Sequence, residues 1–356
     1  MDRSTDYPEL RLIAWEVTQA CNLACKHCRA QAKNCPDLSV LNTCESKELI
    51  KSFKELGDPL VILTGGEPLM RRDIFELATF ATNQGLRCVM ATNGTLVTPE
   101  IVDKMLSSGI QRVSISIDGP QAEIHNDFRG LQGAFQDSMQ GIANLRDKGM
   151  PFQINTTITK SNLPYLKDMF YLADRLEAVA WHIFLLVPMG RAIELQEEIM
   201  SPEEYEDVLH WFYDFRKSSK MQLKATCAPH YHRILRQRAK YEGIAVNQRN
   251  FGLDAVSRGC LGGIGFCFVS HTGQVQPCGY LNLDCGQIRQ QHFPDIWRHS
   301  TIFQELRDPS QYRGKCGRCE YHYVCGGCRA RALSMNGHYL EEEPLCLYEP
   351  KSGSGQ

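Results

Sequence analysis

Short apolar runs alternate with longer amphipathic stretches along the first half of the chain. The apolar runs have the length of strands and cover residues 12–17, 60–63, 87–91, 113–117, 152–158 and 181–186. The stretches between them carry apolar residues at helical spacing and cover residues 45–56, 73–83, 99–108, 134–148 and 163–176. This alternation predicts an α/β fold with a parallel sheet, open or closed into a barrel. Active sites in such folds lie at the carboxyl ends of the strands.

The pattern changes near residue 200 and again near residue 259. Residues 10–200 form the predicted α/β core, and Ser201 is a predicted N-cap that opens a helical, basic connecting segment over residues 201–258. Residues 259–350 are rich in Cys, Gly, Tyr and Arg, and residues 351–356 resemble a flexible tail. A small domain of that composition usually needs metal to hold it together.

The composition narrows the class of protein. The formal net charge of −2 over 356 residues gives no sign of a nucleic-acid or membrane partner. The N-terminus lacks an apolar signal core, and no apolar run reaches the ~20 residues that span a bilayer. We therefore expect a cytoplasmic protein. Because the cytosol disfavours disulfides, clusters among the 16 cysteines of the chain indicate metal binding.

Three cysteines, Cys21, Cys25 and Cys28, directly follow the first predicted strand. Three thiolates on one tight loop can hold three irons of a four-iron cluster and leave the fourth iron open to a ligand. A structural zinc site is the alternative, but no fourth ligand follows at a spacing typical of zinc.

A Gly65-Gly66-Glu67-Pro68 sequence follows the second predicted strand. Two glycines would let a ligand approach the backbone closely, and the Glu67 carboxylate could accept a hydrogen bond from a bound amine. Taken alone, the same residues could be a turn that ends the strand.

Together these segments resemble the radical S-adenosylmethionine (SAM) enzymes over residues 10–195. The resemblance implies a partial (β/α)6 TIM-like barrel and a [4Fe-4S] cluster on the three cysteines, with SAM at the open iron. One electron then cleaves SAM to a 5′-deoxyadenosyl radical, which abstracts hydrogen from the substrate. The residues that it implies as SAM contacts are Gly65, Gly66, Glu67, Asn93, Ser116, Asp118, Arg129 and Pro188.

The C-terminal cysteines resemble the SPASM extension of these enzymes, which carries auxiliary [4Fe-4S] clusters. By that pattern one cluster is held by Cys316, Cys319, Cys325 and Cys346. A second is held by Cys260, Cys278 and Cys328, with Cys267 as a possible fourth ligand. Two residues separate Cys325 from Cys328, where the usual pattern has three, so the assignment of these ligands stays open. We expect one or two auxiliary clusters. A pair of structural zinc ribbons is the alternative.

Residues 224–249 are locally basic and contain two histidines. We expect His230, His232 and Arg233 to contact the substrate, since guanidinium groups suit carboxylates and histidine can bind iron or move a proton. A solvated helix face is the alternative. Cys227 is either a further metal ligand or a buried thiol.

Residues 225–231, 325–332 and 342–346 resemble the heme synthases of the siroheme-dependent pathway. This resemblance implies oxidative decarboxylation of two propionates of Fe-coproporphyrin III to vinyl groups, giving heme b. It also implies a low-potential electron donor such as ferredoxin or flavodoxin. Alternatives are deacetylation of 12,18-didecarboxysiroheme, a step of heme d1 synthesis, a SPASM peptide-modifying maturase, and a non-catalytic iron–sulfur carrier.

Overall fold

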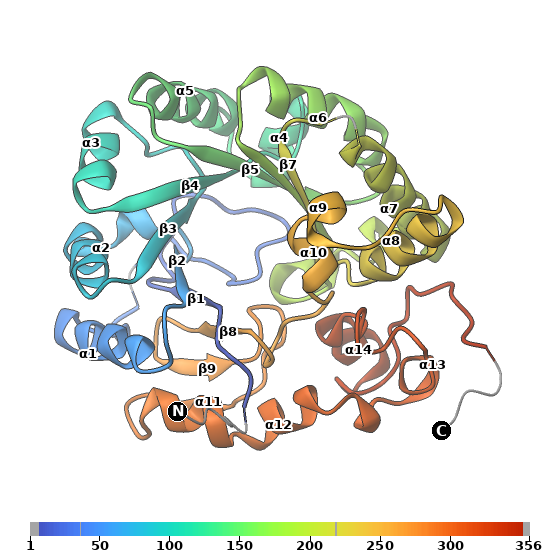
Figure 1. Cartoon of the computed structure of the whole chain (residues 1–356). Coiled ribbons are helices and arrows are strands. Elements are labelled where there is room, and N and C mark those ends of the chain that lie inside the picture. The colour runs from blue at the N-terminus through green and yellow to red at the C-terminus, as the bar shows by residue number, and fades with distance from the viewer. Residues whose placement is uncertain (1–6, 36, 218, 352–356) are drawn as a thin grey trace.

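One ten-stranded sheet runs through the chain in the order β10-β9-β8-β1-β2-β3-β4-β5-β6-β7 (Figure 1). The computed structural model describes residues 7–35, 37–217 and 219–351. The strands are β1 Leu12–Glu16, β2 Leu60–Thr64, β3 Arg87–Thr92, β4 Ile110–Ser116, β5 Phe152–Ile158, β6 Ala180–Leu185, β7 Gln222–Thr226, β8 Phe266–Val269, β9 Gln274–Gln276 and β10 Gly286–Gln287. Neighbours from β8 through β7 pair in parallel, whereas β9 and β10 add antiparallel pairs at one edge.

Helices cover the outside of the curved parallel sheet (Figure 1). Those of the barrel are α1 Thr43–Lys54, α2 Ile74–Asn83, α3 Pro99–Ser107, α4 Ala122–Arg129, α5 Ala134–Asp147, α6 Leu166–Arg175, α7 Pro202–Arg216 and α8 His230–Tyr241. The later helices are α9 Gln248–Phe251, α10 Leu253–Val256, α11 Phe293–His299, α12 Thr301–Arg307, α13 Gly314–Gly317 and α14 Arg329–Asn336. Short 3-10 turns are Pro68–Met70, Leu163–Tyr165, Gly190–Glu194, Gln196–Glu198 and Pro309–Gln311.

Local sequence signals set where the helices begin. The Ser201 hydroxyl accepts a hydrogen bond from the Glu204 backbone at 3.2 Å, and the Glu204 carboxylate accepts one from the Ser201 backbone, which forms a capping box. The predicted N-cap at Ser201 is therefore confirmed. Between sheet and helices lies the apolar core, in which the fully buried Trp15 ring meets Phe53 edge-on at 6.2 Å.

The predicted α/β fold is confirmed, and the structure extends it on both sides. The segment 201–258 is not wholly helical, because residues 222–226 form β7 and pair in parallel with β6. The Cys-rich region also joins the sheet, since β8 pairs in parallel with β1. β7 lies at an edge and is only partly buried, so its residues carry little apolar signal.

The predicted tail lies outside the described residues except for Lys351. Among the helices that the structure describes, none combines the length and apolar character needed to cross a membrane.

Candidate active site

Cys21, Cys25 and Cys28 lie on the loop that leaves the carboxyl end of β1. The loop packs into a small apolar cluster with Leu23 and Ala32. Backbone N–H groups point at two of the sulfurs, from Leu23 to Cys21 Sγ at 3.4 Å and from Ala32 to Cys28 Sγ at 3.4 Å. Such N–H donors stabilise thiolates that bind iron. The three predicted ligands are thus brought together.

The segment after β6 holds this loop in place. The Arg191 backbone donates to the Cys28 carbonyl at 3.0 Å, and its guanidinium donates to the Cys25 carbonyl at 2.8 Å and the Ala32 carbonyl at 3.0 Å. Gly190 adopts a φ of +60°, and a Cβ there would clash with the Arg29 carbonyl. The neighbouring Pro188, which we predict to contact SAM, is buried. Sequence reasoning missed the role of Arg191, because its partners are carbonyls more than 150 residues earlier in the chain.

Arg129 lies beside the cysteine loop at the C-terminus of α4. Its Nη1 is 3.7 Å from Cys25 Sγ, and its guanidinium forms a buried ion pair with Asp118. Burial raises the pKa of the Cys25 thiol, and the Arg129 charge opposes that rise. Arg129 Nε is buried with no hydrogen-bond partner among the described residues. A buried donor without a partner, next to three thiols, fits a bound carboxylate.

Glu67 is fully buried at the carboxyl end of β2. It accepts hydrogen bonds from Thr92 Oγ1 at 2.7 Å, the Asn93 backbone at 2.8 Å and the Leu69 backbone at 3.1 Å. Burial raises the pKa of this carboxyl to about 7, against the effect of those hydrogen bonds. A carboxylate kept in such a place, with lone pairs left over, can accept from one more N–H group.

The backbone of Gly65 and Gly66 is approached by the chain's own carbonyl groups, where we expected a ligand. A Cβ at Gly65 would lie 2.5 Å from the Thr18 carbonyl oxygen, and one at Gly66 would clash with the Ala20 carbonyl. The glycines are needed because the chain's own loop after β1 packs against them. This contact joins the Glu67 turn to the cysteine loop.

Asn93 and Ser116 complete the set at the strand ends. The Asn93 amide donates to Asn22 Oδ1 at 2.8 Å and lies 3.9 Å from Cys21 Sγ. Ser116 ends β4 and is half-buried, and Asp118, two residues on, accepts from the Thr157 backbone at 2.7 Å. The loops after β1, β2, β3 and β4 therefore meet at one edge of the sheet, where the sequence predicts SAM to bind.

Four of the C-terminal cysteines line one small cavity. They are Cys316, Cys319, Cys325 and Cys346. Backbone N–H groups point at three of their sulfurs, from Tyr321 to Cys319 at 3.4 Å, from Gly327 to Cys325 at 3.5 Å and from Glu343 to Cys316 at 3.3 Å. This arrangement fits the predicted four-cysteine cluster. Within the described part of the chain, no three His, Cys, Asp or Glu side chains lie close enough to hold a single metal ion.

The remaining cysteines separate into two places. Cys278 packs against the apolar cluster that contains Cys328, and a Cβ at Gly262, two residues after Cys260, would lie 3.6 Å from Cys278 Cβ, so these three cysteines lie in one region. Cys267 lies elsewhere, fully buried in β8 opposite Ile13 of β1. Burial raises the pKa of the Cys267 thiol, and the neighbouring thiol of Cys285 raises it further. The expectation of Cys267 as a fourth ligand is therefore corrected, because strand pairing commits its side chain to the barrel core.

His230, His232 and Arg233 are all buried in α8, with exposed fractions of 0%, 7% and 3%. Arg233 pairs with Glu206 at 2.6 Å, and His230 and Arg233 line the cavity of the four cysteines. Burial lowers the pKa of His230 to about 4. These three side chains are therefore enclosed, contrary to the expectation from local charge, because the first turns of α8 are buried, whereas Lys240 near its end is exposed.

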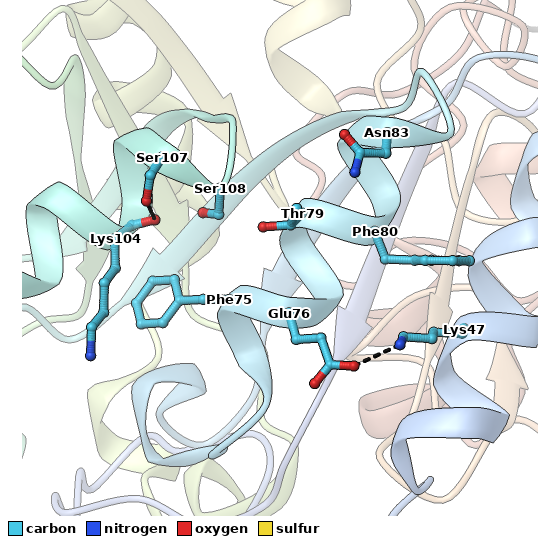
Figure 2. Close-up of a pocket in the computed structure, with 9 residues that line it drawn as sticks. All are labelled: Lys47, Phe75, Glu76, Thr79, Phe80, Asn83, Lys104, Ser107 and Ser108. Atoms are coloured by element: carbon cyan, nitrogen blue, oxygen red, sulfur yellow. Dashed lines mark hydrogen bonds and ion pairs between the residues drawn. The ribbon is translucent and has the colours of Figure 1, made fainter.

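A separate surface cavity of about 420 Å³ lies on the helical layer. Figure 2 shows α2 residues Phe75 and Phe80 along it and the Lys47–Glu76 ion pair, 2.6 Å long, across its rim. None of its lining residues is a cysteine or belongs to the site described above.

Comparison with known proteins agrees with this geometry. Residues 15–170 match the radical SAM superfamily, and residues 260–328 match the SPASM iron–sulfur cluster-binding domain. An AdoMet-dependent heme synthase of Oleidesulfovibrio alaskensis is 61% identical over 97% of this chain and 89% of that protein. One of Methanosarcina barkeri is 54% identical over 96% of this chain and 97% of that protein.

Solved structures with low sequence identity share the fold. Streptococcus suis SuiB bound to S-adenosylmethionine superposes with a TM-score of 0.73 at 14% identity, covering 96% of this chain and 79% of that one. The structure of anSMEcpe with bound AdoMet and the Cp18Cys peptide superposes with a TM-score of 0.66 at 20% identity, covering 94% of this chain and 92% of that one. The chain therefore belongs to the radical SAM superfamily, as an enzyme with a SPASM domain that uses SAM and iron–sulfur clusters.

Proposed function

We propose that this enzyme acts in heme biosynthesis and converts Fe-coproporphyrin III to heme b by oxidative decarboxylation of two propionates. The observation that carries the proposal is the 61% identity to an AdoMet-dependent heme synthase along nearly the whole chain. Identity of that extent covers the barrel, the connecting segment and the Cys-rich region together.

The residue roles follow from the site. Cys21, Cys25 and Cys28 would hold the [4Fe-4S] cluster, and when bound this cluster and SAM supply a radical able to take hydrogen from an unactivated carbon. Glu67 would accept a hydrogen bond from the SAM amino group. Arg129 would bind the SAM carboxylate through the nitrogen that has no partner in the described structure.

Two further regions of the site would orient SAM. Asn93, Ser116 and Asp118 come from the ends of β3 and β4, and Pro188 lies in the segment that clamps the cysteine loop. Because these loops are tied to one another by hydrogen bonds, the cofactor would meet a site that is already ordered.

The chemistry needs an electron acceptor. Each propionate loses one hydrogen atom from its β-carbon and then breaks the bond to its carboxylate, so that carbon dioxide leaves and a vinyl group remains. One electron is left over at each step. The C-terminal cysteines would hold auxiliary clusters that accept it, and a low-potential ferredoxin or flavodoxin would reduce the first cluster.

The test is an anaerobic assay of the reconstituted enzyme with SAM, a reductant and Fe-coproporphyrin III. We expect the mass of heme b, release of carbon dioxide and 5′-deoxyadenosine that depends on the porphyrin, and we expect Cys25→Ala to form none of these. An unchanged porphyrin with active wild-type SAM cleavage would refute the assignment of substrate.

A second candidate is deacetylation of 12,18-didecarboxysiroheme. A relative in Methanosarcina barkeri named Fe-coproporphyrin III synthase is 30% identical over 94% of this chain and 87% of that protein. Acetate released from that substrate in the same assay would favour this candidate. A mycofactocin maturase of Mycolicibacterium smegmatis is similarly distant, at 31% identity over 94% of this chain and 82% of that protein.

A further inference from the structure

Cys227 has an unusual backbone conformation directly after β7. Its φ is +55°, in the left-handed region that residues with a Cβ rarely adopt. Such a conformation costs about 1–3 kcal/mol and persists only where the surroundings fix it. Strain of this kind is common where a side chain must be aimed at a ligand.

Two buried side chains fix the Cys227 backbone. Its carbonyl accepts hydrogen bonds from Tyr205 Oη at 2.9 Å and from Arg331 Nη2 at 2.7 Å. Arg331 is fully buried and is itself held by Glu343 Oε1 at 2.8 Å and the Leu186 carbonyl at 2.9 Å. The orientation of Cys227 is therefore determined from both the barrel and the C-terminal region.

The Cys227 side chain lies with three other cysteines. Cys227 and Cys278 both pack against the apolar cluster that contains Cys328 and Val187. Gly259, next to Cys260, packs against Pro229, two residues after Cys227, since a Cβ at Gly259 would lie 2.6 Å from Pro229 Cα. Four sulfurs thus share one site, and they come from the end of β7, the loop before β8, the loop after β9 and the start of α14.

We propose that Cys227 is the fourth thiolate ligand of the auxiliary cluster held by Cys260, Cys278 and Cys328. The proposal rests on the auxiliary clusters of the proposed function. It places one ligand outside residues 260–328, the segment that matches the SPASM domain. The cluster then has four cysteine ligands and no open iron, so it suits electron transfer and cannot bind the substrate at iron.

The position of Tyr280 and Arg29 supports an electron-transfer role. Burial raises the pKa of Tyr280, and among the thiols that raise it further are those of Cys227, Cys278 and Cys28. Arg29 pairs with Glu16 at 2.6 Å and stacks over Phe268 at 4.4 Å. Arg29 directly follows Cys28, and a Cβ at Gly279, which directly follows Cys278, would lie 3.1 Å from Arg29 Cδ, so the cysteine loop after β1 approaches the site of Cys227 at Arg29.

The test uses the full chain with Cys21, Cys25 and Cys28 replaced by Ala, which removes the cluster whose open iron would confuse the result. In this background we compare Cys227→Ala with Cys267→Ala, a matched control whose thiol is buried in the core. Each protein is reconstituted anaerobically and reduced, and its iron content and electron paramagnetic resonance spectrum are measured with and without added imidazole. No porphyrin or SAM is present, so the result does not depend on the proposed reaction.

We expect imidazole to leave the spectra of the background and of Cys267→Ala unchanged. In Cys227→Ala we expect either a spectrum that shifts with imidazole, because one iron is now open, or a loss of about four irons per chain. If Cys227→Ala does not fold, Cys227→Ser replaces it, and an oxygen ligand should alter the spectrum without imidazole. An iron content and spectrum identical to the background in these variants, or an imidazole response already present in the background, would overturn the proposal.

Discussion

Replacing Arg331 with Met should destabilise this enzyme strongly. The Arg331 guanidinium is fully buried and donates to Glu343, Leu186, Tyr205 and Cys227. Although burial alone would raise the pKa of Glu343, the Arg331 charge keeps it lowered, so the pair is ionised. The Arg331→Met substitution leaves that carboxylate without its counter-charge in the protein interior.

The expected cost is about 3–5 kcal/mol, the range found when one partner of a buried ion pair is removed. The double substitution Arg331→Met with Glu343→Gln should recover part of this loss, because no uncompensated charge then remains, while the amide oxygen introduced by Glu343→Gln can still accept from the Cys328 backbone. Together with the Glu343→Gln single variant, these measurements form a double-mutant cycle that gives the coupling energy of the two residues.

The matched control is Arg313→Met, which removes the 3.2 Å ion pair between Arg313 and Glu341, whose side chains are 55% and 31% exposed. An exposed pair contributes about 0–1 kcal/mol, so this variant should be nearly neutral. The assay is anaerobic urea unfolding of the reconstituted proteins, followed by circular dichroism. The shift of each unfolding midpoint, multiplied by one shared m value, gives the change in the free energy of unfolding. If Arg331→Met shifts the midpoint no more than Arg313→Met does, the reasoning from burial is wrong.

Three further predictions concern other parts of the molecule. His271 is hydrogen-bonded to Glu16 at 2.6 Å and to Asp37 at 3.0 Å, and although burial opposes the shift, these partners raise its pKa above 6.5. The stability that His271 contributes should be complete below pH 6.5 and lost as the pH rises through the raised pKa. This pH dependence of the free energy of unfolding should be absent in His271→Gln. Gly66→Ala should abolish 5′-deoxyadenosine formation, because its Cβ would displace the cysteine loop. Gly265→Ala is the control and should leave this activity intact, because its Cβ would meet no atom nearer than 3.7 Å. Glu67→Gln should weaken SAM binding and flatten its pH dependence. With a pKa of about 7, the wild-type carboxylate is mostly charged at pH 8 and mostly neutral at pH 6, which should lower SAM affinity by about tenfold over this range. The amino group of SAM titrates equally with both proteins, so this tenfold change is the expected difference between them. An equal pH slope for both proteins in equilibrium dialysis would contradict the last prediction.

The sequence predicts the strands of the barrel and most of the barrel's helices, because the apolar periodicity of these segments is strong. It does not predict β7, whose side chains are half in solvent, or the pairing of β8 with β1, which joins residues about 250 positions apart. The assignment of cysteines fails for the same reason. Cys267 stands between two predicted ligands in the chain, but strand pairing turns it into the core, whereas Cys227 is distant in sequence and near in space.

The pairing of β8 with β1 has a consequence for biogenesis. Until residues 266–269 leave the ribosome, β1 is an unprotected edge of the nascent sheet, with one row of backbone N–H and C=O groups unpaired. The loop that bears the first three cysteines begins at the end of this strand. Loading of iron into that loop should therefore follow translation of most of the chain, and a truncation before residue 266 should yield an aggregation-prone fragment instead of a smaller working barrel.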